Sequence, residues 1–259
     1  MNIRKFVFIS LCGLLGFLNS KAESGKLDSL KSALKSERND SAKVHILIQM
    51  AMSLENNGSE NEETYSRQAL ELSKKNNYNK GIAIASDRLG VMERNRSNYK
   101  QALAFHNQAL QHITPYGICR EKAIILNNIG VVYRRLDELS KAAEYHLRAL
   151  TIAEEIADNK SISVSTNSLG NIFFSQNNFN EALNYFQKAL DQEEKSKNLL
   201  GVAINLNNIG AVYELKEDYN KAVNYYSKSL KVNEQIGSKK GVSICLNCLG
   251  GIYLKQKII

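Results

Sequence analysis

The sequence contains a single proline and no tryptophan among its 259 residues. Proline breaks helices and marks turns, so its near absence favours a mostly helical chain. Hydrophobic residues make up 43% of the sequence and charged residues 23%, which is typical of a globular protein rather than a disordered one. Beyond the N-terminus, no segment approaches the about 18 continuous apolar residues of a membrane-spanning helix. We therefore expect no membrane insertion of the mature chain.

The sequence also lacks a dense block of basic residues, although its formal charge is +8. The first 22 residues contain three basic and no acidic residues, so the remainder carries a formal charge of +5. These charges are spread singly along the chain, whereas a nucleic-acid-binding protein concentrates them on one face. We expect no nucleic-acid partner.

Catalytic motifs are missing as well: there is no nucleophile elbow, phosphate-binding loop or carboxylate pair. Cys245 and Cys248 have the spacing of a redox or metal motif, but they lie inside a predicted helix without a second pair. We interpret them as packing residues, with a strained disulfide as the alternative. His106 and His146 stand where later units have aromatic residues, which indicates packing. We expect no enzymatic activity, metal, cofactor or small-molecule substrate.

The N-terminus has the pattern of a secretory signal peptide. Arg4 and Lys5 precede an apolar run over Phe6–Leu18, and Ser20 and Ala22 supply small residues at the −3 and −1 positions of a cleavage site. The apolar run is too short to anchor the chain in a bilayer. The sequence therefore predicts a signal peptide over 1–22 and a periplasmic or secreted protein.

A 40-residue period runs through the rest of the chain. The repeated small residues are Gly90, Gly130, Gly170, Gly210 and Gly250, together with Ala102, Ala142, Ala182 and Ala222. Aromatic residues recur with the same step at Tyr65, Phe105, Tyr145, Tyr185 and Tyr225. So many columns in register predict a repeat protein in which each unit packs only on its neighbours.

Each unit is predicted to contain two helices. In the unit 123–162, apolar residues at helical spacing indicate helices from about Ala123 to Leu136 and from about Leu139 to Ile156. The recurring glycine and alanine positions indicate a close approach of these helices. Asn98, Asn178 and Asp218 are predicted to cap second helices, and Gly81, Gly201 and Gly241 to lie in turns between units.

These columns resemble those of the tetratricopeptide repeat family, in the longer variant seen in kinesin light chains. The resemblance covers about residues 43–256 and implies an all-α fold, a right-handed α-solenoid of antiparallel helix pairs. The units are 43–82, 83–122, 123–162, 163–202 and 203–242, then an incomplete unit 243–259 with only its first helix. The unit 43–82 is degenerate, with Met50 in place of glycine and Glu62 in place of alanine, and 23–42 is predicted to form a cap with a helix near Leu27–Ser36.

Polar residues recur at position 5 of the first helices. In the family, this position and its neighbours line the concave groove, so the resemblance implies a groove that grips an extended peptide through amide side chains. The predicted groove residues are Asp87, Asn127, Asn128, Asn167, Asn207, Asn208, Asn247, Arg94 and Arg134. Solvated asparagines without a ligand are the alternative. Position 5 has no lysine, which argues against capture of a free C-terminal carboxylate.

The sequence thus predicts a non-catalytic, exported bacterial scaffold that binds a protein or peptide, in one version as the sensory part of a truncated membrane-bound regulator or kinase. The alternative is an envelope-complex subunit that assembles by homotypic repeat stacking. Its basis is the incomplete last unit, whose apolar residues lack a second helix. Self-association through this unit is expected in that case.

Overall fold

The computed structural model describes residues 20–54 and 60–258. This part of the chain contains twelve α-helices, one 3-10 helix and no strand. It divides into two compact units, 20–152 and 153–258, which are described separately. The predicted signal peptide lies outside the described residues, apart from its last three positions. The all-α class expected from the sequence is confirmed.

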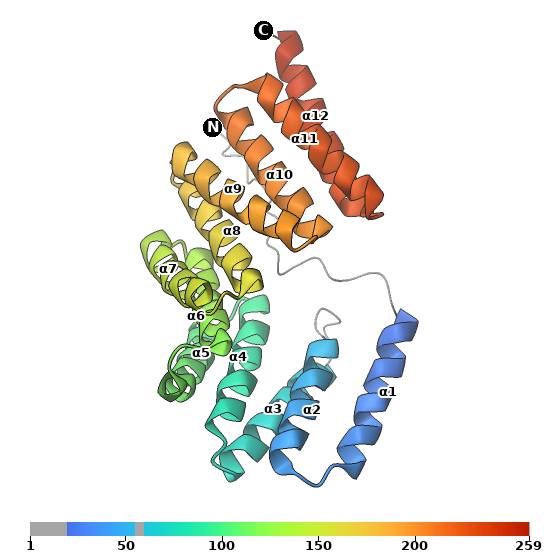
Figure 1. Cartoon of the computed structure of the whole chain (residues 1–259), viewed down its shortest axis with the longest axis vertical. Helices are drawn as coiled ribbons and strands as arrows, with labels where there is room; N and C mark the ends of the chain where they lie inside the picture. The colour runs from blue at the N-terminus through green and yellow to red at the C-terminus, as the bar shows by residue number, and fades with distance from the viewer. Residues whose placement is uncertain (1–19, 55–59, 259) are drawn as a thin grey trace. The chain divides into compact units, whose positions relative to one another are not determined.

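The unit 20–152 is a succession of helix pairs, coloured blue to green in Figure 1. Its helices are α1 (Ser20–Ser36), α2 (Asp40–Ser53), α3 (Glu60–Lys75), α4 (Asn79–Asn95), α5 (Tyr99–Ile113), α6 (Arg120–Arg135) and most of α7 (Leu139–Glu155). Each of α1 to α5 packs on the next helix, and the first helices also contact one another, α2 with α4 and α4 with α6. This is the contact pattern of a solenoid, as the repeat predicts.

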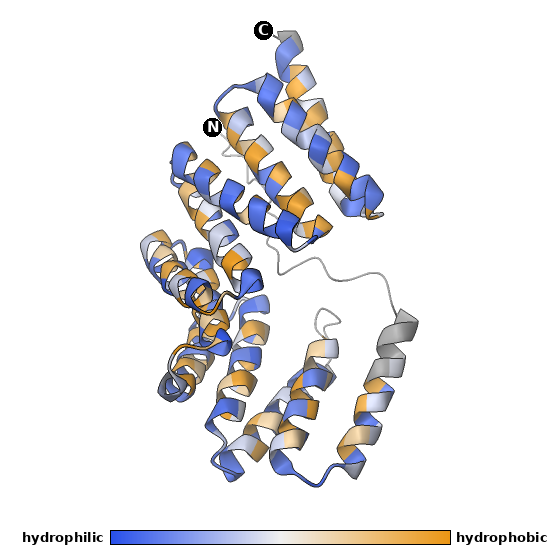
Figure 2. Cartoon of the chain, in the orientation of Figure 1, coloured by the Kyte–Doolittle hydropathy of each residue, from blue (hydrophilic) through white to orange (hydrophobic). Residues whose placement is uncertain are grey.

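The unit 153–258 has the same organisation. Its helices are α8 (Asn159–Ser175), α9 (Phe179–Lys195), α10 (Leu199–Leu215), α11 (Tyr219–Gln235) and α12 (Lys239–Ile258). Consecutive helices pack on each other, and the first helices α10 and α12 also touch. Within each unit, apolar residues lie on the helix faces that meet neighbours, while polar residues occupy the outer faces (Figure 2).

The turns between helices share one backbone conformation. A residue with positive φ follows most helices at a spacing of 20, at Asn77, Ser97, Asp137, Ala157, Asn177, Lys197, Glu217 and Gly237. The next residue donates its amide to the carbonyl five residues earlier, as Asn198 does to Glu193 at 2.9 Å. This is the Schellman helix ending, which usually has glycine at the left-handed position. The 40-residue period is therefore built from two halves of equal length.

The turn after α5 is the exception. A 3-10 helix, Thr114–Tyr116, contains the only proline, and Gly117 takes a positive φ of 71°.

The regular spacing of glycine from Gly90 to Gly210 has a direct structural reason. A Cβ added at Gly170 would lie 2.6 Å from the ring of Phe186, and one at Gly210 would lie 2.8 Å from the ring of Tyr226. The atoms nearest to each glycine thus belong to a ring on the second helix. The alanine column, predicted to share this close contact, is fully buried at Ala102, Ala142, Ala182 and Ala222.

Two details of the helix ends differ from the prediction. Asn178 and Asp218 accept the amides of Glu181 and Lys221, as expected of N-caps. Asn98 makes no capping bond, and its side-chain amide donates from Nδ2 to Glu93 Oε2 at 2.8 Å. Gly81, Gly201 and Gly241 lie inside the first turns of α4, α10 and α12 rather than in turns between units. There, a Cβ at Gly201 would collide with the buried carboxylate of Glu193.

In the degenerate unit 43–82, the acidic residue that replaces alanine has a buried basic partner. Glu62 stands in the alanine column and is 7% exposed. Arg88 on α4, itself 8% exposed, donates from Nη2 to Glu62 Oε1 at 2.7 Å. A buried carboxylate is costly unless it is paired and hydrogen-bonded, and this ion pair supplies the partner.

Candidate functional site

The position-5 column begins with two residues that are bonded within their own helix pairs. Asp87 and Asn127, on α4 and α6, are 7% and 4% exposed. His106 bonds through Nδ1 to Asp87 Oδ1 at 2.7 Å, and His146 does the same to Asn127 Oδ1 at 2.8 Å. These polar side chains therefore orient the buried ring of the next helix. Their acceptor oxygens are used inside the protein.

His146 is fully buried, and burial lowers the pKa of its imidazole to about 3, with the nearby positive charge of Arg134 acting in the same direction. The ring is therefore neutral at physiological pH. Its Nδ1–H donates to Asn127, and Nε2 has no hydrogen-bond partner among the described residues. The interpretation of this histidine as a packing residue is supported.

The half-buried Asn128 joins two other predicted groove residues. Its Nδ2 donates to Asp87 Oδ2 at 2.9 Å, and its Oδ1 lies 3.5 Å from Arg94 Nη1. Arg94 also reaches Asn95 Oδ1 at 3.2 Å. Arg94 and Arg134 are both half-buried. In the unit 20–152, three predicted groove residues thus form a connected polar network, namely Asp87, Asn128 and Arg94.

In the unit 153–258, asparagines form a buried cluster between α8 and α10. Asn167, 3% exposed, donates from Nδ2 to Asn205 Oδ1 at 2.9 Å and accepts from Asn171 Nδ2 at 3.1 Å. Asn208 is 4% exposed, and its Nδ2 has no partner in the described part of the chain. Neither Asn171 nor Asn205 was singled out from the sequence, because their columns contain other residue types in other units.

The last two members of the column are more accessible. Asn207 on α10 is half-buried, and within the described part of the chain its side chain has one weak polar contact, in which Oδ1 lies 4.0 Å from the sulfur of Cys245. Asn247 on α12 is exposed. Accessibility of the column therefore increases along the unit 153–258, and these two amides have hydrogen-bonding capacity to offer a ligand.

Cys119, Cys245 and Cys248 are free thiols in the structure. Cys245 is buried beside Ser229 Oγ at 3.3 Å, and burial raises the pKa of its thiol. Burial likewise raises the pKa of Cys248 to about 11. A reactive cysteine needs a lowered pKa, so the environment of this pair agrees with a packing role. Within the described residues, no group of three or more acidic, histidine or cysteine side chains could hold a metal ion.

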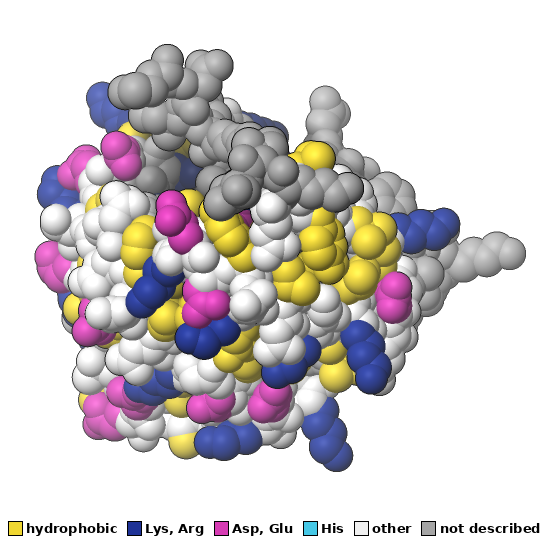
Figure 3. Space-filling model, turned by 90° about the horizontal axis from the view of Figure 1, so that it is seen from above, with side chains coloured by type: hydrophobic (Ala, Val, Ile, Leu, Met, Phe, Trp, Pro, Cys, Tyr) yellow, Lys and Arg dark blue, Asp and Glu magenta, His cyan; other side chains and the backbone are white. Residues whose placement is uncertain are grey.

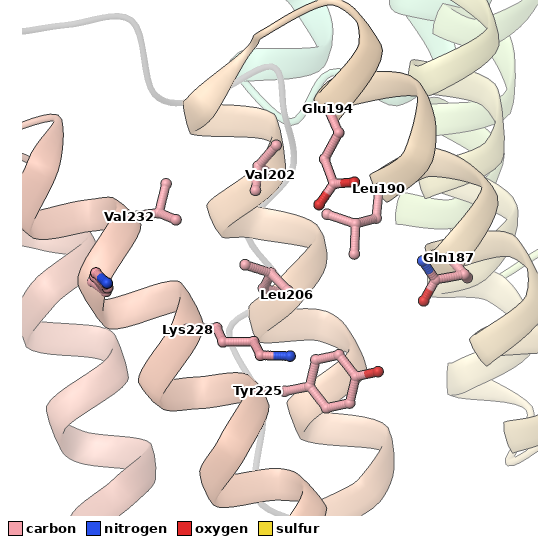
Figure 4. Close-up of a pocket in the computed structure, with 9 residues that line it drawn as sticks. Gln187, Leu190, Glu194, Val202, Leu206, Tyr225, Lys228 and Val232 are labelled. Atoms are coloured by element: carbon pink, nitrogen blue, oxygen red, sulfur yellow. The ribbon is translucent and has the colours of Figure 1, made fainter.

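A surface pocket of about 470 Å³ lies between α9, α10 and α11 (Figure 4). Its apolar floor and charged rim are formed by Gln187, Leu190, Glu194, Val202, Leu206, Tyr225, Lys228, Lys231 and Val232. Lys228 extends over the ring of Tyr225, with Nζ 5.3 Å from the centroid. The pocket combines residues from three helices whose outer positions vary between units. No sequence pattern marked it.

No helix among the described residues is long and apolar enough to cross a membrane. Comparison with curated proteins gives no match.

Solved structures share the fold at low sequence identity. BtubC (BKLC) from P. vanneervenii has a TM-score of 0.72 and 17% identity, over 84% of this chain and 93% of that one. A signal transduction ATPase (STAND) protein from Pyrococcus horikoshii, with a tetratricopeptide repeat sensor, has a TM-score of 0.65 and 18% identity over 91% and 39%. A Rap protein complexed with competence and sporulation factor has a TM-score of 0.66 and 16% identity over 90% and 71%.

Family models for the tetratricopeptide repeat match residues 81–155 and 121–195, and another matches 203–236. Together these matches cover more than half of the sequence, in the same helix pairs that the structure shows. Proteins built from this repeat are typically non-catalytic scaffolds. The chain belongs to the tetratricopeptide repeat family.

Proposed function

We propose that this protein is a non-catalytic scaffold that binds an extended protein or peptide segment along the first-helix face of the unit 153–258. The observation that carries the proposal is the pair of accessible amides at Asn207 and Asn247, next to a buried Asn208 whose Nδ2 is unsatisfied. Amides on successive first helices can pair with both the C=O and N–H groups of an extended backbone. A protein of similar fold, the Rap protein, was solved with a bound factor.

The test is a double variant, Asn207→Ala with Asn247→Ala, assayed against peptides selected from a displayed random library on the whole chain. Loss of two amide contacts should weaken binding by about 1–3 kcal/mol while the far-ultraviolet circular dichroism stays unchanged. Asn184→Ala with Asn224→Ala, at exposed positions of second helices, is the matched control. Equal affinity of the two double variants would rule out the amide face.

Export to the periplasm or medium, and a sensory role in a membrane-bound regulator or kinase, are part of the proposal. The signal-peptide pattern supports the first, and the repeat sensor of the STAND protein is a precedent for the second. Exported protein should begin at Glu23 in N-terminal sequencing. Protein that retains Met1 in the exported fraction would contradict cleavage.

A second candidate is assembly of copies through the last repeat. It is favoured by Leu246, Tyr253 and Leu254 on α12, which are 53%, 54% and 66% exposed. Exposed apolar patches of this kind mark interaction sites. Light scattering over a wide concentration range would show a rising mass if copies stack, and a constant monomer mass if they do not.

A further inference from the structure

The pocket between α9, α10 and α11 has an aliphatic floor that the 40-residue step does not reproduce in earlier repeats. The floor consists of Leu190, Val202, Leu206 and Val232. Each of the three preceding repeats has at least one polar residue at the corresponding positions. These residues are Ser86 and His112, then Lys122, then Thr166 and Gln192. Of the four equivalent places, this one alone therefore offers aliphatic side chains at every floor position.

Lys228, on the rim of the pocket, also differs from its counterparts. Each counterpart has a polar partner: Gln108 bonds with Ser86 at 3.2 Å, Arg148 with Glu144 at 3.6 Å, and Lys188 with Glu154 at 2.6 Å. Lys228 instead extends over the ring of Tyr225. Lys231 lies three residues further along the same face of α11. In the described part of the chain, neither lysine is paired with an acidic residue, so both ammonium groups are available to an anion.

The two sides of the rim differ in charge. Lys228 and Lys231 lie on the α11 side, whereas the exposed Glu194 lies on the α9 side, across the pocket from Lys228 (Figure 4). Gln187, also on α9, donates to Asp191 Oδ1 at 2.7 Å. On the face drawn in Figure 3, side chains of both charges are scattered among hydrophobic ones. A ligand of the pocket therefore matches its charges when its acidic groups lie toward α11 and not toward α9.

We propose that this pocket binds a segment of a partner protein in which aliphatic side chains are followed by acidic ones. The aliphatic side chains lie on the floor, and the carboxylates pair with Lys228 and Lys231. A free small molecule matches less well, because small-molecule sites enclose most of their ligand, whereas the polar rim residues here are all exposed. The pocket lies mainly between second helices, while Asn207 and Asn247 are on first helices, so the proposal does not rest on the amide face.

Three capped tetrapeptides test the proposal, by their effect on methyl NMR signals of the whole chain labelled at leucine and valine. They are acetyl-Leu-Leu-Glu-Glu-amide, acetyl-Leu-Leu-Lys-Lys-amide and acetyl-Ser-Ser-Glu-Glu-amide. The first should shift the signals of Leu190, Val202 and Leu206, and at low salt it should bind about fivefold or more tightly than either of the others. Its advantage over the lysine peptide should shrink at high salt, because these charges are exposed.

Variants of the rim separate charge from packing. Lys228→Gln with Lys231→Gln should weaken binding of the glutamate peptide by about fivefold or more, whereas Glu194→Gln should strengthen it by about twofold, since it removes a repulsive charge. The matched control is Lys74→Gln with Lys100→Gln, which makes the same change of charge at exposed lysines of α3 and α5. It should leave the affinity unchanged, and all three variants should unfold as the natural chain does.

Four results would overturn the proposal. The first three are unshifted signals of Leu190, Val202 and Leu206 with every peptide, equal affinity for the glutamate and lysine peptides, and equal losses in the two lysine double variants. The fourth is octanoate that shifts the same signals and binds as tightly as the glutamate peptide, which would assign the pocket to a free aliphatic acid. Asn207→Ala with Asn247→Ala should leave tetrapeptide binding unchanged, so failure of the amide face is distinguished from failure of the pocket.

Discussion

In both compact units, a ring on the second helix of a repeat packs against the glycine of the first helix, but the type of ring differs. In the unit 20–152 the ring is an imidazole, His106 or His146, whose Nδ1 bonds to the position-5 residue of its own helix pair. In the unit 153–258 the ring is Phe186 or Tyr226, and Tyr226 donates to Glu214 instead. The position-5 amides Asn167 and Asn207 therefore have no ring to bond. The type of ring that packs on the glycine thus decides whether the position-5 side chain is hydrogen-bonded to that ring or is left for other partners.

The largest expected effect of this difference is a dependence on pH. Unfolded His146 binds a proton below about pH 6.5, whereas the folded ring does so only near pH 3. Stability is therefore fully present above about pH 6.5 and is lost as the pH falls toward 3, by roughly 1.4 kcal/mol per pH unit. His146→Phe places at this position the side chain that Phe186 has in the equivalent position. It should reduce the dependence of the unfolding free energy on pH, measured by urea unfolding between pH 7.5 and 5.

The control for that experiment is Asn184→Ala, at an exposed residue that does not titrate. It should leave the slope unchanged. A slope that is the same in His146→Phe and in the natural chain would show that this imidazole is not the group that titrates.

A smaller effect distinguishes Gly210, which packs against a ring, from Gly250, which does not. Gly210→Ala places a Cβ 2.8 Å from the Tyr226 ring and should lower the free energy of unfolding by about 1–3 kcal/mol. Gly250→Ala meets no atom within 4 Å and should be neutral or stabilising by up to about 1 kcal/mol, because alanine favours the helix. Urea unfolding measures both. If the two variants lose equal stability, ring packing is not the reason for the glycine.

The smallest effect concerns the turns, which are alike in both units. Lys197 has a φ of 57°, in the left-handed region that costs residues with a Cβ about 1 kcal/mol. Lys197→Gly should therefore stabilise the unit 153–258 by up to about 1 kcal/mol. Gly237→Ala, at the corresponding turn with a φ of 68°, should do the opposite. Thermal unfolding of the two variants, with opposite shifts in Tm, would support this account.

Much of the fold followed from the periodic pattern. The 40-residue columns predicted the helix pairs because each column records a contact that recurs between neighbouring helices. Helix ends were less predictable. Asn98 has the residue type and place of an N-cap, yet the capping bond is not made and its side chain bonds Glu93 of the preceding helix.

The candidate site was predictable only as a set of positions. The position-5 residues were found by their period, but their burial and partners depend on what stands elsewhere in the repeat. Asn127 is committed to His146, and Asn167 to Asn205 and Asn171, while Asn247 stays exposed. These three contexts belong to one column with one residue type, so the sequence pattern alone does not separate them. The pocket over Leu206 and Tyr225 likewise depends on three helices meeting.

The sequence by itself determined the repeat, the all-α class and the family, since all three depend on local period and on small residues at close approaches. Only the tertiary structure decided which amides are satisfied, that Glu62 is paired with Arg88, and that a ring packs against Gly210. The physical reason is that helix formation and packing period are encoded along the chain. Burial and hydrogen bonding depend on side chains that meet from distant positions.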